Sequence, residues 1–376
     1  MSDRKTLFRN VKRLVVKLGT RVITVRDNAL NAERIEGIAD DVAALRGRGV
    51  EAAVVTSGAI GAGMGRLGLS ARPKAIPELQ AAAAVGQSLL MNAYKLAFRR
   101  RDLTVGQILL TADDLRDRAR YVNARNTLEA LFRFNAVPIV NENDSVAVDE
   151  LLDIRVGDND TLSAYVANLV RADLLVLFSD VDGLYSGDPR RDSDARLIPV
   201  VDRITPDLLA LAGGSGSDVG VGGMRTKLRA AQIVTTAGGM MVIADGASVS
   251  LLDLLDGQET GTVFLPRPGR LTDRKRWIAF APARKGAVVV DDGAARAIGQ
   301  DGKSLLPSGI VEVRGTFDAG EIIDVRRGQE TVARGLARYS SDEVEKIRGL
   351  KSSQIAPALG HPGDDEVIHR DDMVVL

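Results

Sequence analysis

Two lysines in glycine-containing segments are the residues of this sequence best suited to chemistry on phosphate groups. Lys17 lies in Val-Val-Lys-Leu-Gly-Thr, and Lys227 ends Gly-Gly-Met-Arg-Thr-Lys. Two cations brought together by folding would stabilise the charge that spreads over the oxygens of a phosphoryl group during its transfer. Neither segment has the G-x-x-x-x-G-K-[ST] spacing of a Walker A loop. A phosphate site is therefore predicted only if the rest of the chain supports it.

Loops that follow short apolar runs carry further candidate residues. Ser57 lies in a glycine-containing loop whose backbone could approach a ligand closely, or which could simply turn into the next helix. The run Asn141 to Asp144 is typical of a turn, and equally of a site for an amino acid's ammonium and carboxylate groups. Asp160 could cap the helix that follows it, or could hold two lysines in place as a carboxylate between two cations.

Two more segments could contact a nucleotide. Ser179 and Asp180 follow the strongest apolar run of the chain, although a turn is the simpler account of any one aspartate there. Gly222 and Gly223 would place backbone N–H groups and Lys227 at a helix N-terminus, which favours an anion, whereas a loop without a ligand is the alternative. Each signal is weak alone, and their order along the chain makes the combination strong.

Short β-branched or leucine-rich runs alternate with longer alanine-rich segments over the first two-thirds of the chain. This alternation predicts an α/β domain, a three-layer αβα sandwich with a mainly parallel sheet, in which ligands bind beyond the carboxyl ends of the strands. The predicted strands are Leu14 to Leu18, Ala52 to Thr56, Val105 to Leu110, Val137 to Asn141, Leu174 to Phe178 and Met240 to Ala244. The predicted helices are Ala32 to Arg46, Leu79 to Phe98, Asn123 to Phe134, Thr161 to Asn168 and Thr226 to Ala237.

The pattern changes after about Phe264, where prolines, glycines and basic residues follow one another. Beyond them, shorter segments separated by glycines predict a small, mostly β domain. Its predicted strands are Ala287 to Val290, Ile310 to Arg314, Glu321 to Arg326 and Val332 to Tyr339. We therefore expect a first domain over residues 1–265, a linker over 266–284, and the β domain with its C-terminal tail over 285–376.

The composition argues against several kinds of site. Fifty Lys+Arg balance fifty Asp+Glu in 376 residues, which does not suit a strongly basic nucleic-acid binder. With no Cys and only His361 and His369, thiolate, zinc-thiolate and Ser-His-Asp chemistry are disfavoured, so any metal would be a hard cation such as Mg²⁺. No signal-peptide core follows the basic start, and no run approaches the roughly 20 apolar residues of a membrane span, so the cytoplasm is the expected compartment.

These motifs together resemble the amino acid kinase superfamily and, within it, the glutamate 5-kinases. The resemblance runs almost end to end, and its C-terminal part, from about Lys285 to Gly363, resembles a PUA domain. It implies the amino acid kinase fold and ATP-dependent phosphorylation of the side-chain carboxylate of L-glutamate, the first step of proline synthesis, with Mg²⁺ as cofactor. Feedback inhibition by proline and assembly into homodimers or homotetramers are implied in the same way. The segments that carry the resemblance are Val15 to Thr20, Thr56 to Ile60, Ala84 to Ser88, Asn141 to Asp144, Val156 to Asp160, Asp182 to Tyr185 and Gly222 to Lys227.

The resemblance also implies roles for individual residues. The implied ATP contacts are Lys17, Ser179, Asp180, Val221, Gly222, Gly223, Met224, Arg225, Thr226 and Lys227. The implied L-glutamate contacts are Ser57, Gly58, Ala59, Asn143, Asp144, Asp158 and Asn159. The implied catalytic residues are Lys17, Lys227, Asp160 and Asp158. We hypothesise that the two lysines stabilise the transferring phosphoryl group while Asp160 orients both. A glutamate side chain, with a pKa of about 4.3, is already ionised at neutral pH, so no general base is required.

Three residues depart from the family pattern. Arg21 stands where a small residue is usual, and Ser179 and Val221 stand where threonine is common. Val221 leaves only backbone contacts near the phosphates at its position. Arg21 could either alter the phosphate contacts or point outward.

The sequence disfavours three other functions. An acetylglutamate kinase is disfavoured by the appended β domain and by the run Asn141 to Asp144. RNA binding through the PUA-like domain is weakened by the zero net charge and by an aromatic content of 4%. An inactive, regulatory relative would lack a site residue, and none is missing.

Overall fold

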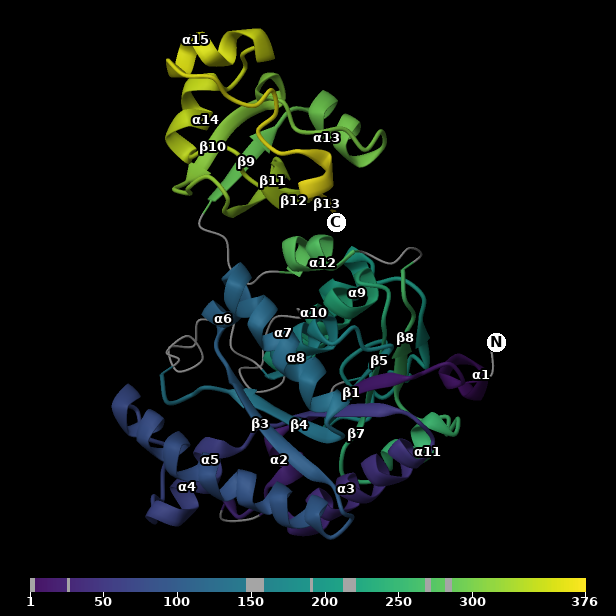
Figure 1. Cartoon of the computed structure of the whole chain (residues 1–376). Coiled ribbons are helices and arrows are strands. Elements are labelled where there is room, and N and C mark those ends of the chain that lie inside the picture. Colours follow the sequence, from purple (N-terminus) through teal and green to yellow (C-terminus); the bar gives the residue numbers. More distant parts are fainter. Residues whose placement is uncertain are drawn as a thin grey trace. The chain divides into compact units, whose positions relative to one another are not determined.

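The chain divides into two compact units, residues 1–269 and 270–376 (Figure 1). The computed structural model describes residues 4–25, 28–146, 159–189, 192–211, 221–267, 272–280 and 286–376. In its described part, the stretch 266–284 contains a helix, α12 (Asp273–Phe280), where a linker was expected. The predicted domain boundaries at 265 and 285 stay predictions.

An eight-stranded sheet forms the middle of the first unit, in the order β3-β4-β2-β1-β5-β7-β8-β6. The strands are β1 (Arg13–Leu18), β2 (Glu51–Val55), β3 (Thr104–Leu110), β4 (Ala136–Glu142), β5 (Leu174–Ser179), β6 (Val200–Val201), β7 (Met240–Asp245) and β8 (Thr262–Phe264). All neighbours pair in parallel except β7 and β8, which are antiparallel. The six predicted strands are present, whereas β6 and β8 were missed because two or three residues are too few to show a pattern.

Helices cover both faces of this sheet, which confirms the predicted three-layer αβα sandwich (Figure 1). The helices α3 and α5 pack on one face, and α7, α8 and α10 pack on the other. The bounds are α1 (Arg4–Phe8), α2 (Thr20–Ile23), α3 (Ala32–Gly47), α4 (Ala59–Leu67), α5 (Ile76–Arg99), α6 (Ala112–Arg116), α7 (Arg118–Arg133), α8 (Asn159–Leu169), α9 (Pro206–Leu211), α10 (Val221–Thr236) and α11 (Leu251–Leu255). Among the described residues, no helix combines the length and the apolar character needed to cross a bilayer.

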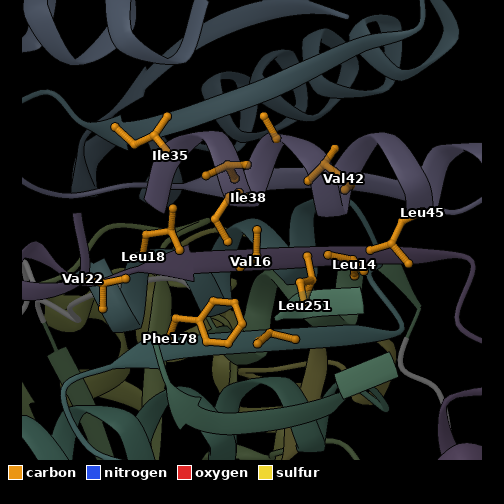
Figure 2. Packing of buried hydrophobic residues seen from close by; sticks show 14 of the residues in the cluster. Leu14, Val16, Leu18, Val22, Ile35, Ile38, Val42, Leu45, Phe178 and Leu251 are labelled. Carbon is orange, nitrogen blue, oxygen red and sulfur yellow. The ribbon is translucent and has the colours of Figure 1, made fainter. Parts of the chain in front are cut away.

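The central strand β1 is buried on both of its faces, as expected of a strand inside a parallel sheet. Leu14, Val16 and Leu18 point toward α3, where they pack with Ile38 and its neighbours (Figure 2). Because successive side chains of a strand point to opposite faces, Lys17 points away from that apolar cluster. One strand therefore anchors the core with alternate residues and presents a lysine to the other face.

The second unit is built on a five-stranded sheet in the order β10-β9-β11-β12-β13. Its strands are β9 (Gly286–Val290), β10 (Ile310–Gly315), β11 (Ile322–Arg327), β12 (Glu330–Leu336) and β13 (Met373–Val375). Its helices are α12, α13 (Asp292–Gly299), α14 (Ser341–Ile347) and α15 (Ile355–Leu359), with the short 3₁₀ turns η2 (Pro307–Gly309), η3 (Ser352–Gln354) and η4 (Arg370–Asp372). A separate apolar cluster fills its interior, so the predicted small, mostly β domain is confirmed.

Candidate active site

The candidate residues meet at the carboxyl edge of the parallel strands β1, β2, β4 and β5. In an open parallel sheet this edge is where ligands bind, because the strand-to-helix loops gather there. Lys17 lies inside β1 and Asn141 is one of the last residues of β4. Both belong to the strands predicted over Leu14 to Leu18 and Val137 to Asn141, so the sheet holds their side chains.

A buried aspartate joins the two lysines of the predicted phosphate site. Asp160 Oδ1 accepts from Lys17 Nζ at 2.5 Å, and Asp160 Oδ2 accepts from Lys227 Nζ at 2.8 Å. Thr226 Oγ1 donates to Asp160 Oδ2 at 3.1 Å. The side chains of Lys17, Lys227 and Asp160 are only 6%, 9% and 1% exposed. The three groups carry a formal net charge of +1, so the cluster favours an anion.

The two lysines keep Asp160 ionised. Burial by itself raises the pKa of a carboxyl group, but the charges and hydrogen bonds of Lys17 and Lys227 outweigh it and lower the pKa of Asp160 to about 2. The carboxylate is therefore charged throughout the neutral range. Its two oxygens hold the ammonium groups at fixed positions, which is the geometry needed to place two cations on one phosphoryl group.

Two helices bring Asp160 and Lys227 to this point. Helix α8 begins at Asn159, so Asp160 is its second residue, and its carboxylate binds the lysines; the alternative that Asp160 caps the helix is wrong. Helix α10 begins at Val221, five residues earlier than predicted, so Lys227 lies in its second turn. The helix is therefore longer than its alanine-rich part indicated, because the glycines at 222 and 223 are helical as well.

The loop after β2 turns sharply and starts helix α4. Gly58 has φ +92°, a conformation that residues with a side chain rarely adopt, and it precedes the first helical residue, Ala59. The helix α4 was not among the predicted helices, although a turn into a helix was one of the two alternatives for this loop. The N–H groups in the first turn of any α-helix lack intrahelical acceptors, so they favour an anionic group placed next to Ser57.

A chain of polar side chains extends from Ser57 across the strand ends. Asn159 Nδ2 donates to Ser57 Oγ at 2.8 Å and to Asn141 Oδ1 at 3.5 Å. Asn141 Nδ2 donates to Gln87 Oε1 at 2.9 Å. Ser57 and Asn159 were predicted as substrate contacts and Asn141 only as part of the run Asn141 to Asp144, whereas Gln87 was not assigned a role. The segment Ala84 to Ser88 had been noticed only as a matching motif, and no local signal tied Gln87 to the site.

On the other side of Lys17, the end of β5 carries the predicted nucleotide contacts. Ser179 is buried, and its Oγ donates to Asp180 Oδ1 at 3.1 Å. Arg21 Nη1 lies 2.5 Å from Asp180 Oδ2, although 70% of the arginine side chain is exposed. Burial favours the neutral form of Asp180, but the hydrogen bonds from Arg21 and Ser179 hold its pKa below the usual range. Arg21 therefore points outward to an aspartate rather than toward Asp160.

The remaining predicted residues surround these clusters to different degrees. Asn143 Oδ1 accepts from Ser145 Oγ at 2.6 Å in the turn after β4, and Asp144 follows in the same turn. In the first turn of α10, Gly223 and Arg225 are exposed and Met224 is half-buried. Asp158 and the side chain of Val221 lie outside the part of the chain that the structure describes.

In the part of the chain that the structure describes, no group of three or more carboxylate or histidine side chains is arranged to hold a metal ion. Both oxygens of Asp160 already accept from lysines.

A mainly parallel sheet with two buried lysines at its carboxyl edge defines a class of protein, the enzymes that transfer phosphoryl groups. A model of the amino acid kinase family matches residues 12–245, and a model of the PUA domain matches residues 286–359. The first match covers more than half of the chain, so the chain belongs to the amino acid kinase family.

Curated proteins that are similar to nearly the whole chain are named glutamate 5-kinase. The one from Moorella thermoacetica is 50% identical, over 97% of this chain and 96% of its own length. Those from Syntrophotalea carbinolica and Geobacter sulfurreducens are 48% identical over 99% of this chain, and over 99% and 100% of their own lengths. The resemblance to the glutamate 5-kinases, with an appended PUA domain, is therefore confirmed.

Proposed function

We propose that this chain transfers the γ-phosphoryl group of ATP to the side-chain carboxylate of L-glutamate, which forms L-glutamyl 5-phosphate, the first intermediate of proline synthesis. The observation that carries the proposal is the buried ion cluster of Lys17, Asp160 and Lys227. Its aspartate follows Asn159 directly at the start of α8, and the amide of Asn159 reaches Ser57. Cations for a phosphoryl group and polar groups for an amino acid are thus joined through two consecutive residues of α8.

The chemistry requires little beyond position and charge. The attacking carboxylate is ionised at neutral pH, so it needs no base to remove a proton. Lys17 and Lys227 would neutralise the oxygens of the transferring group, and Asp160 would keep the two ammonium groups at fixed positions. Mg²⁺, held through the phosphates of ATP, would supply the remaining neutralisation. The proposed ATP contacts at Ser179, Asp180 and the start of α10 complete the arrangement.

Trapping the product with hydroxylamine tests this function directly. The protein is incubated with Mg-ATP and hydroxylamine and with one acceptor at a time: L-glutamate, N-acetylglutamate, aspartate or UMP. We expect hydroxamate to form with L-glutamate alone, because an acyl phosphate reacts with hydroxylamine and the site suits a free amino acid. If no acyl phosphate can be trapped from any carboxylate acceptor, the proposal is wrong. Omission of the metal should abolish the product, which tests the role of Mg²⁺.

Two properties implied by the resemblance remain proposals, inhibition by proline and assembly into homodimers or homotetramers. The cytoplasmic location expected from the sequence is also a proposal, and RNA binding by the PUA domain stays a disfavoured alternative. Titration of the hydroxamate assay with L-proline tests the first, and sedimentation equilibrium tests the second. Filter binding across a salt series tests RNA binding, because contacts with phosphates weaken steeply as salt rises.

A further inference from the structure

Gln87 ends the row of hydrogen-bonded polar side chains that starts at Ser57, and it has no role in the proposed reaction described above. The chain passes from Ser57 to Asn159 and then through Asn141 to Gln87. Asn141 is 1% exposed and Asn159 is 8% exposed. Amide groups buried to this extent are normally satisfied on both the oxygen and the nitrogen side, because an unmade hydrogen bond in the interior is costly.

Two side-chain atoms in this row of polar residues lack a hydrogen-bond partner. In the described structure, Asn159 Oδ1 and Gln87 Nε2 are buried and have no hydrogen-bond partner. One is an acceptor and the other is a donor, and they lie at opposite ends of the row of three amides. A buried acceptor without a partner, beside the hydroxyl group of Ser57, is what a ligand with a positively charged N–H group would satisfy.

The three amides are oriented as one unit. Asn141 has its nitrogen toward Gln87 Oε1 and its oxygen toward Asn159 Nδ2. Turning any one amide by half a rotation would bring two NH₂ groups or two oxygens face to face. The orientation of Asn159, with its oxygen left open, therefore depends on Gln87 through Asn141.

Helix α5 holds Gln87 firmly in place. At Gly86, an added Cβ would lie 1.7 Å from the carbonyl oxygen of Ala59, so α5 and α4 cross in direct backbone contact. One face of α5 also carries Tyr94, whose hydroxyl lies 2.9 Å from Oγ1 of Thr56. Thr56 is the residue before Ser57. Gln87 and Tyr94 are seven residues apart and share one helix face, so both reach the ends of neighbouring strands.

We propose that Gln87 is a positioning residue for the acceptor substrate. Through Asn141 it holds the Asn159 amide with Oδ1 directed at the α-ammonium group of the amino acid. This inference rests on the proposed function, and it names the feature of the substrate that the amide chain selects: a free ammonium group next to the carboxylates. A dicarboxylate without that group, such as glutarate, gains nothing from the orientation of Asn159.

Calorimetric binding of L-glutamate and glutarate tests this role without relying on turnover. The variants are Gln87→Met, which keeps the size and removes both polar atoms, Asn141→Leu, and the double variant. Ser88→Ala is the matched control, because Ser88 is the next residue of α5 and its hydroxyl bonds only to Val85 O within that helix. We expect Gln87→Met to weaken L-glutamate binding about tenfold, the effect of one lost hydrogen bond, and to leave glutarate binding and the KM for ATP within about twofold.

The double variant should be no worse than the more affected single variant, because both changes break the same chain. Equal weakening of L-glutamate and glutarate, additive effects in the double variant, or an effect of Ser88→Ala of the same size would each overturn the inference. A wild-type protein that binds L-glutamate but forms no hydroxamate would overturn the proposed function alone. A wild-type protein that binds neither dicarboxylate would overturn both.

Discussion

In the first unit two lysines and an aspartate are buried within hydrogen-bonding distance of one another, whereas most described ion pairs of the second unit lie at its surface. Removing charges from water costs several kcal/mol per ion even when the charges are paired. The second unit folds around an apolar cluster and buries one charged residue among those described, Asp324. Its most buried carboxylate, Asp324, pairs with the facing strand residue Arg334 at 2.8 Å. The cluster in the first unit is therefore costlier to bury than the surface pairs of the second unit, which is why we place the proposed chemistry there.

Removal of a buried lysine should have the largest effect on activity. Lys227→Ala takes away one of the two cations proposed to contact the phosphoryl group, and we expect kcat to fall by about 10³-fold. Hydroxamate formation under saturating ATP and L-glutamate measures it. Arg229→Ala, an exposed residue of the same helix, is the control and should keep its activity. Near-normal kcat in a folded Lys227→Ala protein would mean that the buried charges of the first unit have no more part in catalysis than the surface ion pairs of the second.

The glycine contact beneath the site should come next. Gly86→Ala places a methyl group against the backbone of α4, and we expect a loss of about 2–3 kcal/mol in the free energy of unfolding. Gly37→Ala in α3 is the opposite case, because nothing lies within 4 Å of the added Cβ, so it should stabilise the protein by about 1 kcal/mol. Urea denaturation of both variants checks the pair. Equal effects would show that helix propensity, rather than the close contact, governs both positions.

The ion pair in the second unit should affect stability and not turnover. Arg334→Met removes a charged hydrogen-bond partner of the buried Asp324 and should lower the unfolding free energy by about 2 kcal/mol. The exposed Arg327 pairs with Asp292, and Arg327→Met should change stability by less than about 0.5 kcal/mol. Thermal unfolding measures both. A fall in kcat for Arg334→Met would mean that the second unit takes part in the reaction.

The low pKa of Asp160 predicts a stabilisation that acid removes. Its pKa in the folded protein is about 2, below the ordinary value, so its contribution is complete above about pH 5 and is lost as the pH falls toward 2. Between pH 6 and pH 3 the stability advantage of wild type over Asp160→Asn should shrink by about 1 kcal/mol. Urea denaturation at both pH values measures it. An advantage that stays constant with pH would show that Asp160 is not held ionised by its lysines.

The exposed pair beside the site should have the smallest effect. Arg21→Ala removes the partner of Asp180 at a position open to solvent, so the unfolding free energy should change by less than about 1 kcal/mol. The KM for ATP should change by no more than a few-fold, and less in high salt, because salt screens exposed charges. Steady-state kinetics at two salt concentrations checks this. A large loss of kcat would mean that Arg21 contacts the phosphates despite its outward position.

The fold class, the order of the main strands and helices, and the family can be recognised from the sequence alone. Strands such as β1 and helices such as α3 are visible locally, because their apolar residues recur with the period of the element that buries them. The motifs are short and contiguous, so their spacing could be compared directly with a known family. The buried ion cluster was also anticipated, since its three residues are conspicuous in their own segments.

The contacts between side chains far apart in the sequence could be established only from the three-dimensional structure. Lys17 and Asp160 are 143 residues apart in the chain, and Gln87 reaches Asn141 across 54 residues. No local pattern encodes such a contact, because it depends on the crossing of α4 and α5 and on the register of parallel strands. The outward pairing of Arg21 with Asp180 was open for the same reason. Segments specify elements, whereas hydrogen bonds between side chains form only once the elements have packed.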